Sequence, residues 1–295
     1  MLTGTEINDW SVPIVLLRLL EGEVLFYKGL GWVVKGYQHP GDAIVAYPRY
    51  DLLTGGKLGH HELKWLTEFM KNWDCIKRNV PLVPLAEAVK PIIRMDERVA
   101  YLLSTLSKLI RSKGEEIEIS GSSILASSNP RDVDVIVYNS TFETVSLLEE
   151  LLNKGVIGRA SEQLVITEYL EKHSSKMSLE NYFKLKRDTI LHFTLARAHV
   201  NVKLVARSRG YNYCVDKVEG YVAYNGFFKI LERITAPLIP ARYLVKVGGE
   251  IMEMESLREV YSELKPGEYY MMGGIIEERR RGRVLVPDHG VVIPK

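Results

Sequence analysis

The chain has 295 residues, of which 46% are hydrophobic and 26% charged, and its formal net charge is +2. This length allows two or three domains with hydrophobic cores, and the composition excludes a chain dominated by disorder. The small net charge argues against a uniformly basic nucleic-acid binder but allows a local basic patch.

The cysteine content and the N-terminal apolar run indicate the cellular compartment in which we expect the protein. The only cysteines are Cys75 and Cys214, so we expect neither a disulfide framework nor a cysteine-based zinc site. The apolar run 12–20 is short and is interrupted by Pro13 and Arg18, so we expect neither a signal peptide nor a membrane span. The sequence therefore predicts a cytoplasmic protein with no membrane partner.

Residues 1–94 are predicted to form a β-rich N-terminal domain with one helix. Short apolar stretches at 23–27, 32–35 and 43–47 are separated by turns that contain glycine or proline, which is typical of strands. Apolar residues at helical spacing predict the helix over residues 61–72.

Residues 95–212 are predicted to form a second domain. An amphipathic helix is expected over residues 96–113, because its apolar residues recur three or four positions apart. A strand at 116–120, a break at Gly121-Ser122 and a second strand at 132–138 follow. Another helix is expected over residues 141–152, where a threonine precedes an apolar run.

The second of these strands carries two carboxylates at alternate positions. Because alternate strand residues point to the same face, Asp132 and Asp134 should lie side by side, where a cation between them relieves their repulsion. Gly121 allows close backbone approach, and the Ser122 hydroxyl and nearby amides can receive an anion. Arg131 is either a further phosphate ligand or the ion-pair partner of the carboxylates. The alternative is a surface strand with two solvated aspartates after an ordinary turn.

The full pattern resembles the signature of the DNA polymerase β-type nucleotidyltransferase superfamily, in which Gly-Gly or Gly-Ser is followed, about ten residues later, by Asp-hydrophobic-Asp. Here nine residues separate Gly121-Ser122 from Asp132-Val-Asp134. The resemblance implies that the two aspartates hold Mg²⁺ or Mn²⁺ and that Gly121 and Ser122 hold phosphates of a nucleoside triphosphate. It also implies a polymerase β-like domain, a mixed sheet with helices, at the centre of the chain.

Residues 161–205 should complete this domain. We expect a strand at 164–169, a basic helix over 179–188 and a strand at 198–205. The superfamily often places a third carboxylate on such a later strand, but Asn201 and Lys203 stand there instead. Either Glu162 or Glu168 substitutes, the substrate supplies the missing ligand, or catalysis has been lost.

Residues 213–295 show short strands between glycine, proline and charged turns, which predicts a small barrel or sandwich of the OB-like kind. The predicted fold class is therefore α+β, with the polymerase β-like domain between a β-rich N-terminal domain and this C-terminal unit. The motifs around 34–40, 46–50 and 240–243 resemble archaeal proteins that carry a nucleotidyltransferase domain between two small domains.

The predicted function is metal-dependent transfer of a nucleotide from a nucleoside triphosphate to an acceptor. A basic bias from Lys184 to Arg209 and the OB-like unit favour RNA or DNA over a metabolite as the acceptor, whereas the near-neutral total charge opposes it. The alternative is a nucleotide- or nucleic-acid-binding module that retains the fold without transfer activity.

Overall fold

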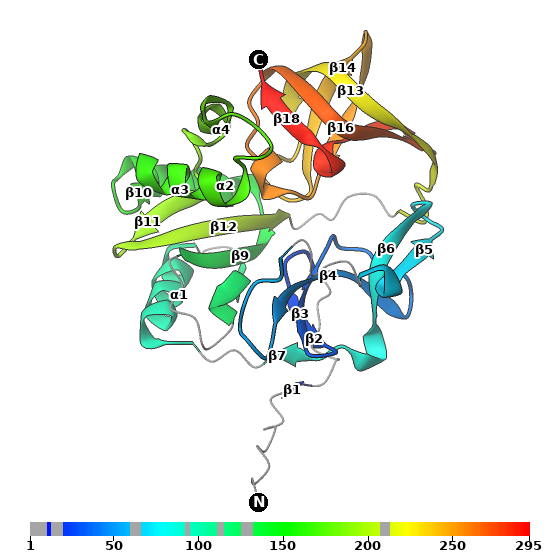
Figure 1. Cartoon of the computed structure of the whole chain (residues 1–295). Coiled ribbons are helices and arrows are strands. Elements are labelled where there is room, and N and C mark those ends of the chain that lie inside the picture. Colours follow the sequence, from blue (N-terminus) through cyan, green and yellow to red (C-terminus); the bar gives the residue numbers. More distant parts are fainter. Residues whose placement is uncertain are drawn as a thin grey trace, which may run out of the picture.

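The computed structural model describes residues 11–12, 20–59, 66–91, 95–110, 115–124, 132–206 and 213–295. Strands make up 47% of the structure and helices 24%, and the strands form three large sheets, one of which closes into a barrel. The predicted α+β class with a polymerase β-like central domain is therefore wrong. That domain would be rich in helix, whereas hydrogen bonding between strands dominates here (Figure 1).

The N-terminal sheet is antiparallel, and its strand order is β2-β3-β4-β6-β5. Its core contains Trp32 and Leu25, which are fully buried, and Phe69, which meets Trp32 edge to face. The predicted helix over 61–72 is wrong at its C-terminal end, where a strand begins at Met70, and residues 61–65 lie outside the described residues. The strands are β2 (Val24–Tyr27), β3 (Leu30–Val34), β4 (Ala43–Asp51), β5 (Met70–Trp73) and β6 (Arg78–Pro84).

The central sheet is mixed, with strand order β10-β11-β12-β9-β8, and only the β12–β9 pair is parallel. One face is apolar, since Val133, Val135 and Val137 share a buried core with two helices, α1 (Glu97–Ile110) and α2 (Phe142–Asn153). The opposite face carries the polar residues of the candidate site. The strands are β8 (Glu116–Ser120), β9 (Asp132–Ser140), β10 (Gly158–Arg159), β11 (His192–Leu195) and β12 (Ala198–Ala206).

Two further helices, α3 (Glu162–Lys172) and α4 (Leu179–Lys186), follow α2 and contact each other. The predicted strand at 164–169 is wrong, because these residues form the middle of α3. The Ser161 side chain accepts a hydrogen bond from the Leu164 amide and caps the helix, and Val165 packs with Tyr182 of α4. The apolar run was therefore one face of a capped helix.

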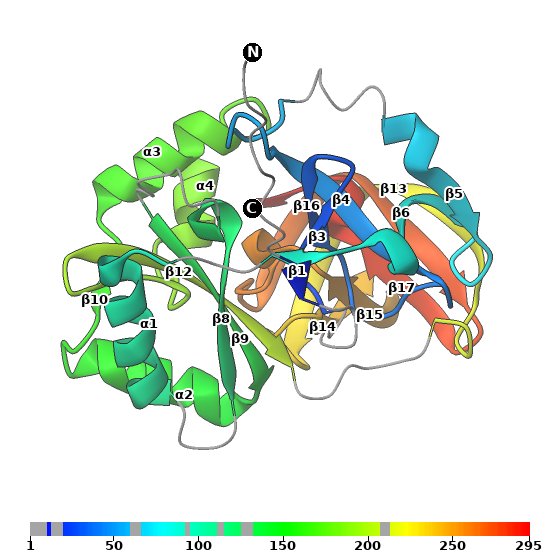
Figure 2. The ribbon, with the colours of Figure 1, turned by 90° about the horizontal axis from the view of Figure 1, so that it is seen from below.

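The C-terminal strands close into a five-stranded barrel, because β13 pairs with both β14 and β16. Figures 1 and 2 show the central unit in green on one side of the molecule, with the blue N-terminal sheet and the yellow-to-red barrel on the other. The barrel strands are β13 (Val218–Arg233), β14 (Ala241–Val247), β15 (Glu250–Ser256), β16 (Gly267–Arg279) and β17 (Gly282–Val286), and β18 (Val291–Pro294) pairs with β16.

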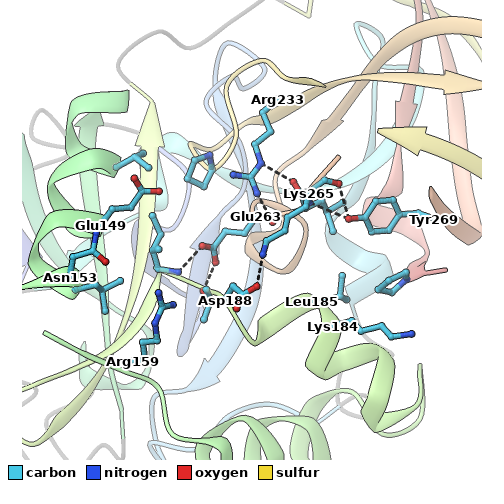
Figure 3. Close-up of a pocket in the computed structure, with 17 residues that line it drawn as sticks. Glu149, Asn153, Arg159, Lys184, Leu185, Asp188, Arg233, Glu263, Lys265 and Tyr269 are labelled. Atoms are coloured by element: carbon cyan, nitrogen blue, oxygen red, sulfur yellow. Dashed lines mark hydrogen bonds and ion pairs between the residues drawn. The ribbon is translucent and has the colours of Figure 1, made fainter. Parts of the chain in front are cut away.

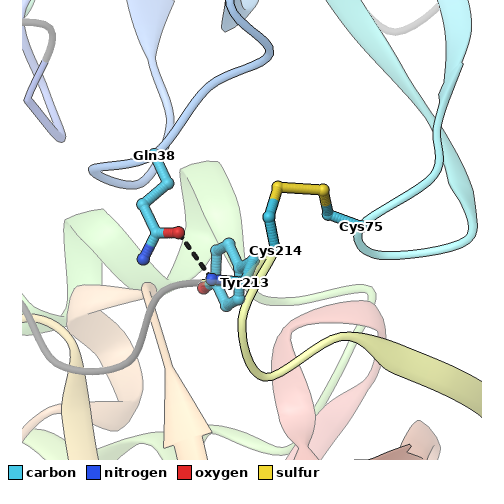
Figure 4. Close-up of a disulfide and its surroundings, with 4 residues drawn as sticks. All are labelled: Gln38, Cys75, Tyr213 and Cys214. Carbon is cyan, nitrogen blue, oxygen red and sulfur yellow. Dashed lines mark hydrogen bonds between the residues drawn. A yellow bond between two sulfur atoms is a disulfide. The ribbon is translucent and has the colours of Figure 1, made fainter.

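A disulfide joins Cys75 and Cys214, which are 139 residues apart in sequence and have Cα atoms 4.7 Å apart. It links the turn between β5 and β6 to the segment that enters the barrel, where the Tyr213 amide also donates a hydrogen bond to Gln38 (Figure 4). The expectation that the two cysteines form no disulfide is therefore wrong, because only the tertiary fold brings cysteines so distant in sequence together.

Within the described parts of the chain, every helix falls short of the length and hydrophobicity that a membrane-spanning helix needs.

Candidate functional site

The two aspartates lie on the polar face of the central sheet. Asp132 and Asp134 lie on β9, and His199 and Asn201 of β12 are their register partners in the neighbouring parallel strand. The Asn201 Nδ2 atom donates hydrogen bonds to Asp132 Oδ2 at 2.8 Å and to Asp134 Oδ1 at 3.0 Å. The two carboxylates therefore converge on one amide group.

The glycine turn lies directly against this pair. Gly121 begins a short 3-10 turn after β8, and its φ of +68° is in the left-handed region that favours glycine. A Cβ atom at this position would overlap the Asp134 carboxylate. The backbone of the turn and the acidic pair thus form one compact unit. The Ser122 side chain and the whole of Arg131 lie outside the described residues, so their phosphate-binding roles stay predictions.

The N-terminal sheet contributes a tyrosine to the same site. Tyr50 of β4 is 3% exposed, and burial together with the negative charges of Asp134 and Asp132 raises its pKa to about 12. Its hydroxyl therefore remains protonated near neutral pH and provides a neutral hydrogen-bonding group close to the acidic pair.

A buried ion-pair cluster connects the N-terminal segment to the same face of the sheet. Glu21 is 1% exposed, and its Oε1 atom lies 3.0 Å from both Lys35 Nζ and Lys203 Nζ. Burial acts to raise the pKa of Glu21, but the two lysines and the Gly36 amide outweigh it and hold the pKa below its ordinary value. Lys203 stands two residues after Asn201 on β12, so this cluster borders the acidic pair.

A pocket of about 360 Å³ opens beside Asp132. Its walls come from β12, which contributes His199 and Asn201, and from α3, which contributes Thr167 and Glu168 among others. Of the two predicted substitute acids, Glu168 lines this pocket and Glu162 does not. Among the residues that the structure describes, no three His, Cys, Asp or Glu side chains form a metal-binding group.

Glu168 takes part in a second polar cluster, which is centred on His192 of β11, the register partner of Asn201. Its Oε2 atom lies 3.6 Å from His192 Nδ1, and His192 Nε2 lies 2.6 Å from Glu259 Oε1 and 3.2 Å from the nitrogen of Lys186. Burial acts to raise the pKa of Glu259, but the hydrogen bond and charge of His192, with Lys186 and Lys203, lower it to about 2. The cluster joins the central sheet to the barrel.

Glu259→Gln should therefore change the dependence of stability on pH. The native pKa of Glu259 lies below the ordinary glutamate value of 4.5, so the ionised carboxylate stabilises the fold above about pH 4.5 and loses this effect as the pH falls toward 2. We expect the variant to be roughly 2 kcal/mol less stable at neutral pH, a value discounted for partial exposure of the side chain, and to approach the wild type below about pH 3. Urea unfolding at several pH values measures this difference, and a constant difference across that range contradicts the assignment.

A separate pocket of about 390 Å³ lies between α2, α4 and the barrel (Figure 3). Several of its charged groups join the two units: Lys265 pairs with Asp188, and Glu263 accepts hydrogen bonds from Thr189 and the Ile190 amide. Arg233 donates to the backbone carbonyls of Leu264 and Glu263. We therefore interpret this pocket as an interdomain seam and place the candidate site at the acidic pair.

Several of the cations that suggested nucleic-acid binding have structural roles. Lys186 is 5% exposed, and Lys203 pairs with Glu21. Lys184 and Arg187 pair with acidic neighbours on the surface, and residues 207–212 lie outside the described residues.

Comparisons with models of protein families, with curated proteins and with solved structures find no match to this chain. Sequence reasoning missed Glu21, His192 and Glu259, which carried no recognisable spacing, and Tyr50 was noted only within a proline-containing motif.

Proposed function

We propose that this chain transfers a nucleotide from a nucleoside triphosphate to an acceptor hydroxyl, with a divalent cation held by Asp132 and Asp134. The observation that carries the proposal is the convergence of both carboxylates on the Asn201 amide, directly beside the Gly121 turn. Close backbone approach and paired carboxylates are what a metal-bound triphosphate requires.

The residues present fit a hard cation. Rotating the Asn201 amide by 180° about its last torsion exchanges Nδ2 for Oδ1, which directs a third oxygen to the point where the two carboxylates meet. Mg²⁺ and Mn²⁺ prefer such oxygen ligands, and Mg²⁺ typically keeps several waters in place of further protein groups. Two carboxylates with one amide oxygen therefore form an adequate donor set.

In the proposed reaction, the acceptor oxygen forms a bond to the α-phosphorus, and the bond from that phosphorus to the bridging oxygen breaks. Pyrophosphate leaves, and the proton of the acceptor hydroxyl passes to solvent. The bound cation would neutralise negative charge that develops on the phosphates. The amides of the Gly121 turn would hold phosphate oxygens, the Tyr50 hydroxyl would donate a hydrogen bond, and the pocket beside Asp132 would hold the acceptor.

Asp132→Asn combined with Asp134→Asn should abolish cation-dependent triphosphate binding, because the substitutions keep side-chain size and remove both negative charges. Calorimetric titration of Mn²⁺ and a nonhydrolysable triphosphate measures this loss. Glu162→Gln is the matched control, since Glu162 is exposed and lies outside the pocket. Equal binding by the wild type and the double variant contradicts the metal-binding role.

A binding module without transfer activity is the second candidate, and Asn201 favours it. Its amide hydrogens satisfy both carboxylates in the place where a third acid would stand, so the pair is stabilised without a cation. Incubation with labelled triphosphates, Mn²⁺ and pools of RNA, protein and small molecules distinguishes the two. Triphosphate binding without label transfer to any pool supports the binding module.

RNA or DNA as the acceptor stays a prediction, as does the cytoplasmic location. The burial of Lys186 and the pairing of Lys203 weaken the case for a polynucleotide surface. The Cys75–Cys214 bond bears on the location, because disulfides persist in oxidising compartments and, among intracellular proteins, mainly in hyperthermophiles.

A further inference from the structure

A pocket of about 430 Å³ lies between the N-terminal sheet and the barrel, and it includes neither Asp132 nor Asp134. Its volume is in the range of small-molecule sites, which are typically about 300 to 1,000 Å³. The N-terminal wall comes from β4 and the β5–β6 hairpin, and the opposite wall comes from β15, β16 and the turn at 287–289. The pocket is therefore distinct from the one beside the acidic pair.

Aromatic side chains line one part of this pocket. Trp73 and Tyr213 meet edge to face, with ring centroids 5.9 Å apart and an interplanar angle of 82°, and Tyr47 is 41% exposed. Val45, Ile76 and Val80 add apolar surface beside these rings. The Cys75–Cys214 disulfide stands next to both walls and fixes the spacing of Trp73 and Tyr213, which come from different units. This part of the pocket suits a flat, apolar ring system.

The remaining wall carries more cations than carboxylates, since Lys35, Arg78, Arg258 and Arg279 line it together with Glu255, Glu277 and Asp288. Arg78 and Arg279 both pair with Glu277, and Arg279 and Arg242 both pair with Glu255. Glu277 and Glu255 are 2% and 5% exposed, so little solvent screens this network. Three guanidinium groups therefore share two buried carboxylates, and this excess of positive charge favours an added anion.

Two arginines approach the same point on the barrel side of the pocket. Arg78 contacts the His289 ring. Arg258 donates a hydrogen bond to the backbone carbonyl of Asp288, the residue before His289. Within the described part of the chain, the Nε atom of Arg78 is buried and has no hydrogen-bond partner. Burial, together with the positive charges of Arg78 and Arg258 and against the negative charge of Glu277, holds the pKa of His289 below its ordinary value.

We propose that this interdomain pocket is a second ligand site and that it binds a small planar aromatic anion. The ring would lie against Trp73 and Tyr213, and the anionic group would lie between Arg78 and Arg258. A cationic or uncharged ligand of the same shape would gain the aromatic contacts but would lack the electrostatic attraction of the arginines.

Calorimetric titration of the full chain with 1-naphthyl phosphate tests this proposal, with uncharged 1-naphthol and cationic 1-naphthylmethylamine as comparison probes. We expect saturable binding of one naphthyl phosphate per chain and at least tenfold weaker binding of the other two probes. Arg78→Gln should weaken naphthyl phosphate binding at least tenfold. Arg280→Gln is the matched control, because Arg280 is exposed on the same barrel and lies outside the pocket.

Tyr47→Ala provides a second variant, because this exposed side chain lines the pocket and carries little of the N-terminal core. It should weaken the naphthyl phosphate complex by several fold, independently of whether Arg78→Gln folds. The variant with both Asp132 and Asp134 replaced by Asn should bind the probe as the wild type does, which separates this site from the proposed nucleotide site. Equal affinity for all three probes, no saturable binding of naphthyl phosphate, or unchanged binding by both pocket variants overturns the proposal.

Discussion

Replacing Cys75 and Cys214 together by serine should lower the free energy of unfolding by about 4 to 5 kcal/mol, the range that chain entropy gives for a closed loop of more than a hundred residues. The bond closes a sequence separation of 139 residues, so it removes many conformations from the unfolded chain. The bond also joins the β5–β6 turn to the entry of the barrel, and its loss should loosen these two units first.

Urea unfolding with and without dithiothreitol measures this effect. The reductant should shift the midpoint of the wild type to that of the double serine variant and should leave the variant itself unchanged. If the wild type and the variant have the same urea midpoint without reductant, the disulfide contributes no stability.

The elements that could be predicted from the sequence are those whose pattern is local. The strand expected at 132–138 is observed as β9 (Asp132–Ser140), and the helix expected over 96–113 is observed as α1 (Glu97–Ile110) within the described residues. Each shows a clear period of two or of 3.6 residues, which depends only on neighbours in sequence. The run Leu164-Val-Ile was ambiguous because a short apolar stretch fits either a strand or one face of a helix. The Ser161 cap and the packing on α4 decided the outcome.

The fold class could not be predicted, because it depends on how the strands pair. The closure of the barrel requires β13 to meet β16, and the Cys75–Cys214 bond requires the N-terminal hairpin to meet the same unit. Neither contact leaves a local signal in the sequence. The resemblance carried by Gly121 and the two aspartates therefore led to a predicted fold class with too much helix.

The candidate site also has a part that could be predicted from local sequence and a part that depends on the tertiary fold. The same-face placement of Asp132 and Asp134 follows from alternation along one strand. The position of Asn201 against both carboxylates depends on the parallel register of β12 with β9, which only the structure shows. Glu21 reaches this face from the turn before β2, across more than a hundred residues of sequence, so no motif could have indicated it.

Glu21→Gln should be among the most destabilising single substitutions in the chain, with an expected loss of about 3 to 5 kcal/mol, which is typical when one partner of a buried ion pair is removed. The change keeps the shape of the side chain but leaves Lys203 and Lys35 without the carboxylate that lies 3.0 Å from each. Because the pKa of Glu21 is lowered in the native state, the stabilisation is present above the unfolded pKa, near 4.5, and decreases as the pH falls below it. The difference from the wild type should therefore be large at neutral pH and small in acid.

A double-mutant cycle with Lys203→Met separates the ion pair from simple loss of packing. Lys203→Met removes the partner charge and keeps an unbranched apolar chain, so the double variant no longer buries an unpaired lysine at this position. We expect the double variant to lose less free energy of unfolding than the two single variants lose together. The difference should be at least about 1 kcal/mol, the coupling that contacting residues usually show. Chemical denaturation of the four proteins at neutral pH gives this value. If the two losses of unfolding free energy add, the charge of Lys203 does not hold the N-terminal segment to the acidic site. Glu21 would then stabilise this face through the hydrogen bond that it accepts from the Gly36 amide and through its pairing with Lys35.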